Sequence, residues 1–96
     1  MGRKVVRATP YAVDGKRLKA ARLALGFDVL EHYAREAGIK SNHYSQHETG
    51  VRPITLARAR ALKQKFKLSL DFIFDGDFND LPHGLVNKIK ERLPKP

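Results

Sequence analysis

Short polar side chains gather on one face of a predicted helix near the middle of the chain, over residues 41–49. At about 100° per residue, most of them fall opposite Tyr44 and His47, which predicts one polar face and one inward face. Asparagine and glutamine can each form two hydrogen bonds with adenine N6 and N7 in the DNA major groove, and serine can contact bases or phosphates. The candidate base-contacting residues are Ser41, Asn42, His43, Ser45 and Gln46.

Basic and hydroxyl side chains are the candidates for binding phosphates. They are Lys40, Thr49 and Arg52 beside the helix, and Arg3, Lys4 and Arg7 near the N-terminus. The chain carries 19 Lys and Arg against 10 Asp and Glu, a net charge of +9, which favours a polyanionic partner. Two alternatives stay open: the polar face is ordinary solvated surface, and the N-terminal residues are a solubilising tail rather than a DNA-binding arm.

Composition and motifs disfavour an enzyme, a metal site and a membrane protein. The chain has no cysteine, no nucleophile–base constellation and no Gly-rich phosphate loop. His43 and His47 have the spacing to share a zinc ion on a helix, but no third ligand is apparent, so a packed histidine is the better interpretation. No apolar run approaches the roughly 20 residues that span a bilayer. We therefore expect a cytoplasmic protein that is not an enzyme and has no cofactor or metal.

Apolar periodicity predicts an all-α chain. Residues 1–13 lack helical periodicity and are expected to form an arm, followed by a helical domain over 14–77 and a C-terminal segment over 78–96. Glycines after the predicted helix ends, and polar residues before the predicted helix starts, mark the boundaries. The expected helices cover about 14–25, 29–37, 41–49, 56–67, a short stretch after Ser69, and 81–93.

The expected caps and apolar stripes determine how these helices pack. The expected N-terminal caps are Asp28, Ser41 and Ser69, and Pro53 and Thr55 are expected to introduce the helix over 56–67. The expected core-facing residues of the last three helices are Leu56, Ala59, Leu62 and Phe66, then Leu70, Ile73 and Phe74, and finally Leu85, Val86, Ile89 and Leu93. The last of these stripes can supply a dimer contact or pack back on its own domain, and the sequence leaves both open.

Five segments carry a recognisable combination of residues. They are Arg22-Leu-Ala-Leu-Gly26, Ala34-Arg-Glu-Ala-Gly38-Ile, Tyr44-Ser-Gln-His-Glu-Thr-Gly50-Val-Arg52-Pro, Leu56 to Lys67, and Ser69-Leu-Asp-Phe-Ile-Phe-Asp-Gly76-Asp. Together, over about residues 16–77, they resemble the phage-repressor-like (Xre-type) helix-turn-helix family. The resemblance implies a five-helix domain that enters the DNA major groove with helix 41–49. It also implies that Arg22 pairs with Glu48 and ties the first helix to helix 41–49.

Two features depart from the family pattern. The connection from Gly26 to Gly38 is one residue longer than the commonest spacing. His47 stands where the family more often has a large apolar residue. We therefore expect the packing beneath helix 41–49 to be looser or to include hydrogen bonds.

Two functions of different classes fit these features. The first is a sequence-specific double-stranded DNA-binding transcriptional regulator that acts as a homodimer, because a single helix reads too few base pairs, with repression as the default mechanism. The second is a protein-binding module, an antiactivator or antitoxin-like partner that sequesters another regulator, which would need an exposed apolar patch. A weaker third interpretation is non-specific nucleic-acid binding through charge alone.

Overall fold

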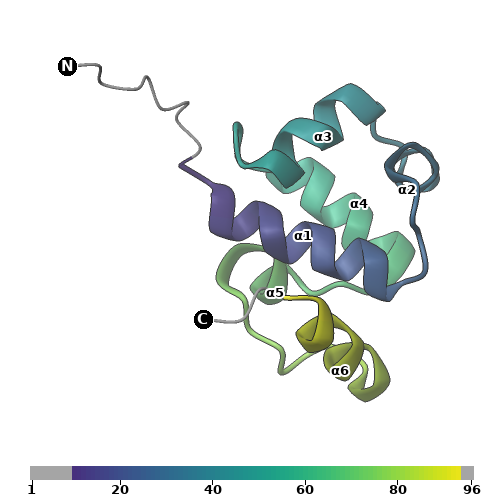
Figure 1. Ribbon diagram of the computed structural model, residues 1–96, viewed down its shortest axis with the longest axis vertical. Coiled ribbons are helices and arrows are strands. Elements are labelled where there is room, and N and C mark those ends of the chain that lie inside the picture. The colour runs from purple at the N-terminus through teal and green to yellow at the C-terminus, as the bar shows by residue number, and fades with distance from the viewer. Residues whose placement is uncertain (1–9, 94–96) are drawn as a thin grey trace.

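Helices alone make up the regular structure of residues 10–93, the part of the chain that the computed structural model describes (Figure 1). Their bounds are α1 (Ala12–Ala24), α2 (Leu30–Ala37), α3 (Ser41–Thr49), α4 (Leu56–Phe66), α5 (Leu70–Asp75) and α6 (His83–Arg92). The all-α prediction is therefore confirmed for the described residues, although α1 begins inside the segment that was expected to be an arm. None of these helices is long and apolar enough to cross a membrane.

The residues expected at the starts of α4 and α5 cap these helices. The hydroxyl oxygens of Thr55 and Ser69 each accept a hydrogen bond from the backbone N–H three residues on, at 3.2 and 3.0 Å respectively. Each bond satisfies an N–H that has no partner inside the helix, and so fixes where the helix begins. Gly38 and Gly50 end α2 and α3 at φ values of 76° and 85°, which residues with a Cβ atom seldom adopt.

Two other predicted caps are wrong. Val29 rather than Asp28 is the N-cap of α2, because Arg22 donates to the Asp28 carbonyl at 3.1 Å and holds this segment as a loop. Lys40 is the N-cap of α3, since the turn after α2 leaves it extended, and Ser41 is the first residue of the helix. Neither cap makes a side-chain hydrogen bond. Side-chain capping therefore does not mark the starts of these two helices.

The central helix is α1, which lies between α3 on one side and α6 on the other (Figure 1). Its Leu18 and Ala21 side chains are fully buried. Beneath α3, the Tyr33 ring stacks on Phe66 with centroids 4.4 Å apart, and the Tyr44 ring lies 5.4 Å from that of Tyr33. These groups belong to one hydrophobic core, which supports the inner face of α3.

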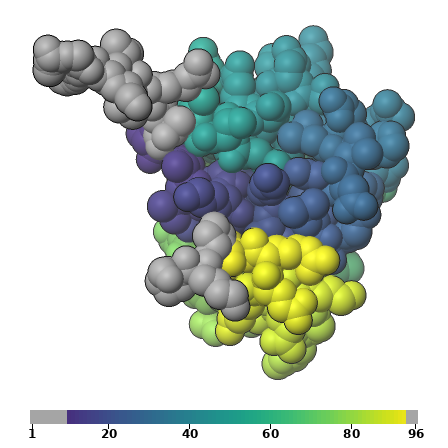
Figure 2. Space-filling model, viewed as in Figure 1, coloured from purple at the N-terminus to yellow at the C-terminus, as the bar shows by residue number. Residues whose placement is uncertain are grey.

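The C-terminal stripe packs on its own domain. Ile89 is fully buried, and Leu85, Val86 and Leu93 are partly buried against the same core. The helix that carries them, α6, lies against α1 on the side away from α3 (Figure 2). Of the two roles that the sequence left open for this stripe, packing on its own domain is the one observed.

Two predicted core residues are wrong. Leu56 is 49% exposed at the first position of α4, and the buried stripe of this helix starts a turn later, at Ala59. Phe74 is 39% exposed, whereas Phe72 is fully buried. The ring of Phe72 lies 5.5 Å from that of Phe78, so the loop before α6 supplies an aromatic partner that turns Phe72 inward. A helix as short as α5 has too few turns for apolar periodicity to fix which face is buried.

Candidate nucleic-acid interface

The C-terminal half of α3 lies against the backbone of α1 at a glycine. Gly15 is buried, and a Cβ atom added there would overlap the Glu48 carbonyl oxygen. It would also come within 2.8 Å of the His47 carbonyl oxygen. Both obstacles are backbone atoms, so they cannot rotate away as a flexible side chain would. The absence of a side chain at Gly15 therefore sets how closely α3 approaches α1.

A buried ion pair holds α3 to α1 beside this crossing. Arg22 Nε donates to Glu48 Oε2 at 2.8 Å, and a second guanidinium nitrogen donates to Oε1 at 3.1 Å. Only 7% of the Arg22 side chain and 6% of the Glu48 side chain are exposed. Burial lowers the pKa of Arg22, but the hydrogen bond and charge of Glu48 outweigh it, so that the net shift is upward. These are the two residues that the family resemblance pairs.

The remaining guanidinium nitrogen of Arg22 supports the loop between α1 and α2. It donates to the carbonyl oxygens of Phe27 and Asp28, at 2.8 and 3.1 Å. One side chain thus connects α1, the start of the α2 segment and the end of α3. We infer that Arg22 orients α3 rather than contacting a ligand.

The outer face of α3 is polar, as its spacing predicts. Tyr44 and His47 are buried, with 0% and 3% of their surface exposed, which confirms the predicted inner face. Asn42 is exposed, and Gln46 is partly exposed. The amide groups of both residues can therefore reach a ligand that lies along α3.

A hollow of about 350 Å³ gathers several of the candidate residues. Its lining has no acidic side chain and consists of Asn42, His43, Gln46, Arg52 and Arg58. Two arginines without a carboxylate among the lining residues favour an anionic ligand, and the amides add hydrogen-bond donors and acceptors. The residue that the sequence analysis missed is Arg58, which belongs to the next helix, α4, and contacts two histidines of α3.

The other candidate residues lie outside this hollow. Ser41 and Ser45 are partly exposed on α3, and Lys40 is exposed just before it. Thr49 is exposed at the end of the helix, where its hydroxyl donates to the Gln46 carbonyl at 3.3 Å, so this proton is already used within α3. The remaining candidates, Arg3, Lys4 and Arg7, fall outside the described residues.

Hydrogen bonds take the place of apolar packing around His47. Its Nδ1 lies 3.2 Å from the Arg52 carbonyl oxygen, and its Nε2 lies 3.0 Å from an Arg58 guanidinium nitrogen. A second Arg58 nitrogen lies 3.0 Å from Nδ1 of His43. Because arginine only donates, His47 accepts at Nε2 and donates from Nδ1–H to the carbonyl. The expectation of hydrogen bonds beneath this helix is therefore confirmed.

This environment makes the stability of the protein sensitive to pH through His47. Burial is the main cause that lowers the pKa of His47, and the Arg58 charge adds to it, while the hydrogen bond to the Arg52 carbonyl opposes them. As the pH falls, the imidazole of His47 therefore becomes protonated at a higher pH in the unfolded chain than in the folded protein. The contribution of neutral His47 to the free energy of unfolding is fully present above the unfolded pKa of about 6.5, and it declines as the pH falls below that value.

Urea unfolding at several pH values between about 7.5 and 5.5 measures this effect. In the His47→Gln variant, the amide can still donate to the Arg52 carbonyl and accept from Arg58, but it does not titrate. We expect the free energy of unfolding to fall less steeply with decreasing pH in this variant than in the wild type. Equal slopes in the two proteins would show that His47 does not carry the dependence.

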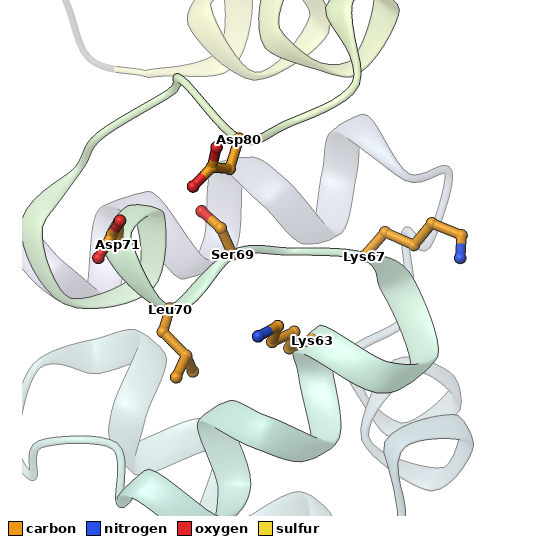
Figure 3. A pocket seen from close by; sticks show the side chains of 6 residues that line it. All are labelled: Lys63, Lys67, Ser69, Leu70, Asp71 and Asp80. Carbon is orange, nitrogen blue, oxygen red and sulfur yellow. The ribbon is translucent and has the colours of Figure 1, made fainter.

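A larger hollow, of about 560 Å³, borders the opposite end of α4 (Figure 3). Lys63 and Lys67 line it together with Asp71 and Asp80, so its charges are mixed. A polyanion would meet carboxylates there as well as ammonium groups. The hollow on α3 is therefore the better candidate for a nucleic-acid contact.

Among the described residues, no group of three or more His, Cys, Asp or Glu side chains is placed to hold a metal ion. No protein-family model, curated protein or solved structure matches this chain. The likeness of residues 16–77 to Xre-type proteins thus stays a prediction from the sequence. Function has to be inferred from the residues of α3 and their surroundings.

Proposed function

We propose that this protein is a sequence-specific DNA-binding transcriptional regulator that places α3 in the major groove of double-stranded DNA. The observation that carries the proposal is the acid-free hollow on α3. There, the amides of Asn42 and Gln46 lie beside the guanidinium groups of Arg52 and Arg58. Amides match the donor and acceptor pattern of an adenine edge, and the positive charge of the guanidinium groups favours the phosphates beside it.

The support beneath α3 is consistent with this role. A helix that discriminates between bases must be held in one orientation, since a small rotation moves every side chain away from its base. The Gly15 crossing and the ion pair between Arg22 and Glu48 fix α3 against α1. Gly38, in the left-handed conformation, joins α2 to α3 through a short turn. This arrangement supports a helix-turn-helix assignment for α2 and α3.

We further propose that the protein binds a two-fold symmetric operator as a homodimer and represses transcription by occluding a promoter. A single helix contacts only a few base pairs, and two copies double the site. The protein-sequestering alternative is less well supported. It would use the C-terminal stripe, where Ile89 is buried and Leu85, Val86 and Leu93 already pack against the core of the same chain.

Gln46→Ala tests base recognition. We expect this change to cost about 1–3 kcal/mol of binding free energy on the preferred sequence, and to relax the base preference at one or two positions. The measurement is the affinity for a panel of operator variants with single base changes. Gln64→Ala, at an exposed position of α4, removes the same side chain away from the hollow and is expected to leave affinity and preference unchanged.

Arg52→Ala provides the contrast for Gln46→Ala, because a phosphate contact carries no sequence information. It is expected to weaken binding to every sequence alike and to reduce the slope of log affinity against log salt by about one unit. If Gln46→Ala also weakened binding equally on all sequences, α3 would contact only the DNA backbone, and the proposal of base reading would be wrong.

A further inference from the structure

Arg58 bridges two histidines of α3. One guanidinium nitrogen lies 3.0 Å from Nε2 of His47, and another lies 3.0 Å from Nδ1 of His43. All five N–H groups of arginine are donors, so each of these histidine nitrogens must accept through its lone pair. An imidazolium ring carries a hydrogen on both nitrogens and could not accept either bond. Both rings are therefore neutral while the bridge is in place.

The bridge also determines which nitrogen of each ring carries the hydrogen. His47 keeps its hydrogen on Nδ1, where the Arg52 carbonyl accepts it. His43 accepts at Nδ1, so its hydrogen is on Nε2. One carbon atom separates the two nitrogens of an imidazole ring, and their outward bonds diverge in the ring plane, so the Nε2–H of His43 is directed away from Arg58.

His43 differs in this respect from its polar neighbours on α3. It lines the same hollow as Asn42 and Gln46. Each amide offers both donors and an acceptor, and can rotate to suit either kind of partner. A free neutral histidine can likewise exchange between its two tautomers. With Nδ1 occupied by Arg58, only the donor of His43 remains available.

We propose that Arg58 is a positioning residue that holds His43 in one tautomer, so that His43 meets DNA only as a hydrogen-bond donor. This inference rests on the proposed DNA binding. The partner is an acceptor on the DNA: N7 of guanine or adenine, O6 of guanine, O4 of thymine, or a phosphate oxygen. The N4 amino group of cytosine presents a donor in the major groove, so it cannot accept a hydrogen bond from His43. Arg58 thus contributes to specificity without touching the base that His43 reads.

The first test concerns the free protein and does not depend on DNA. Nitrogen-15 NMR of the imidazole rings at about pH 8, where an ordinary histidine is neutral, reports which nitrogen carries the hydrogen. We expect His43 to carry it on Nε2 and His47 to carry it on Nδ1. If His43 carries its hydrogen on Nδ1 in the wild type, the proposal is overturned, whatever the protein binds.

Substitutions at Arg58 show whether the bridge is the cause. Arg58→Met keeps the length of the side chain but removes every donor, and we expect His43 to exchange between tautomers in this variant. Arg60→Met, at an exposed position of the same helix, removes the same charge and should leave both rings as in the wild type. Because Arg58→Met can also unfold the protein, Arg58→Lys is measured beside it. The lysine keeps the charge but has a single ammonium group in place of the forked guanidinium. We expect it to keep the hydrogen bond to one histidine and to lose the bond to the other.

The second test compares DNA preferences of the same proteins and of His43→Ala. At the base position where His43→Ala loses its preference, we expect the wild type to disfavour cytosine relative to guanine, adenine and thymine, which all present an acceptor. Arg58→Met should weaken that preference roughly two- to tenfold, the range of one hydrogen bond. Both His43→Ala and Arg58→Met could instead lose affinity equally on all sequences, and lose more than Arg60→Met does. That result would identify a phosphate as the acceptor.

Two results would overturn the role of Arg58 in binding, for different reasons. If Arg58→Met changed affinity and preference no more than Arg60→Met, its bridge would be purely structural. If the wild type bound no DNA, the proposed function and the DNA contact of His43 would both fail. The tautomer of His43 is measured in the free protein, so a wrong tautomer and a lack of DNA binding are separate results and can be distinguished.

Discussion

Replacing Arg22 by methionine is expected to lower the free energy of unfolding by about 3–5 kcal/mol, which is the usual cost of removing one partner from a buried ion pair. The change leaves the Glu48 carboxylate only 6% exposed and without its cation. It also removes the donor that serves the carbonyl oxygens of Phe27 and Asp28. Because these contacts join α1, the α2 segment and α3, the affinity for DNA should fall together with stability.

Urea unfolding measures this loss, and a surface ion pair provides the matched control. Lys65 Nζ lies 3.3 Å from Glu36 Oε1, and about half of each side chain is exposed. Lys65→Met should therefore cost no more than about 1 kcal/mol. Combining Arg22→Met with Glu48→Gln removes the unpaired charge and is expected to recover part of the loss. An Arg22→Met variant as stable as Lys65→Met would contradict a structural role for the pair.

Gly15→Ala is expected to have the second-largest effect, a loss of about 3 kcal/mol or more, at the upper end of the cost of overpacking. The added methyl group overlaps the Glu48 carbonyl oxygen and crowds that of His47, both of which are backbone atoms. It can be accommodated only if α3 moves away from α1. We therefore expect weaker DNA binding even under conditions where the variant remains folded.

Gly84→Ala is the control for the change at Gly15. Gly84 is exposed on α6, and a Cβ atom there would meet nothing within 4 Å. Alanine favours a helix over glycine, so this variant should gain up to about 0.5–1 kcal/mol. Thermal or urea unfolding of the two variants should thus give shifts of opposite sign. Destabilisation of similar size in both would mean that helix crowding at Gly15 is not the cause.

Much of the helical framework could be predicted from the sequence, because its determinants are local. Apolar spacing located the helices, and the hydroxyls of Thr55 and Ser69 marked two of their starts. The spacing of Tyr44 and His47 also predicted which face of α3 is buried. Each of these features depends on residues a few positions apart, where helix geometry relates sequence to space directly.

The features that were missed depend on contacts between separate elements of the fold. Phe78 lies close to Phe72 along the chain but beyond the end of α5, so helix periodicity does not show that its ring will lie beside Phe72. Gly15 lies within the helix expected over about 14–25, but its contact with the backbone of α3 comes from the helix crossing. Arg58 follows its two histidine partners by 15 and 11 positions. The available signal was His47 itself, since a buried imidazole needs partners for both nitrogens.

The central claim, that α3 reads DNA sequence, is tested most directly by selection from a random double-stranded DNA library with the purified full chain. We predict enrichment of one sequence with two-fold symmetry, with each half-site contacted by one copy of α3. Gln46→Ala should then lose preference at matching positions in the two halves. A selected pool with the same base composition as the starting library would contradict the account.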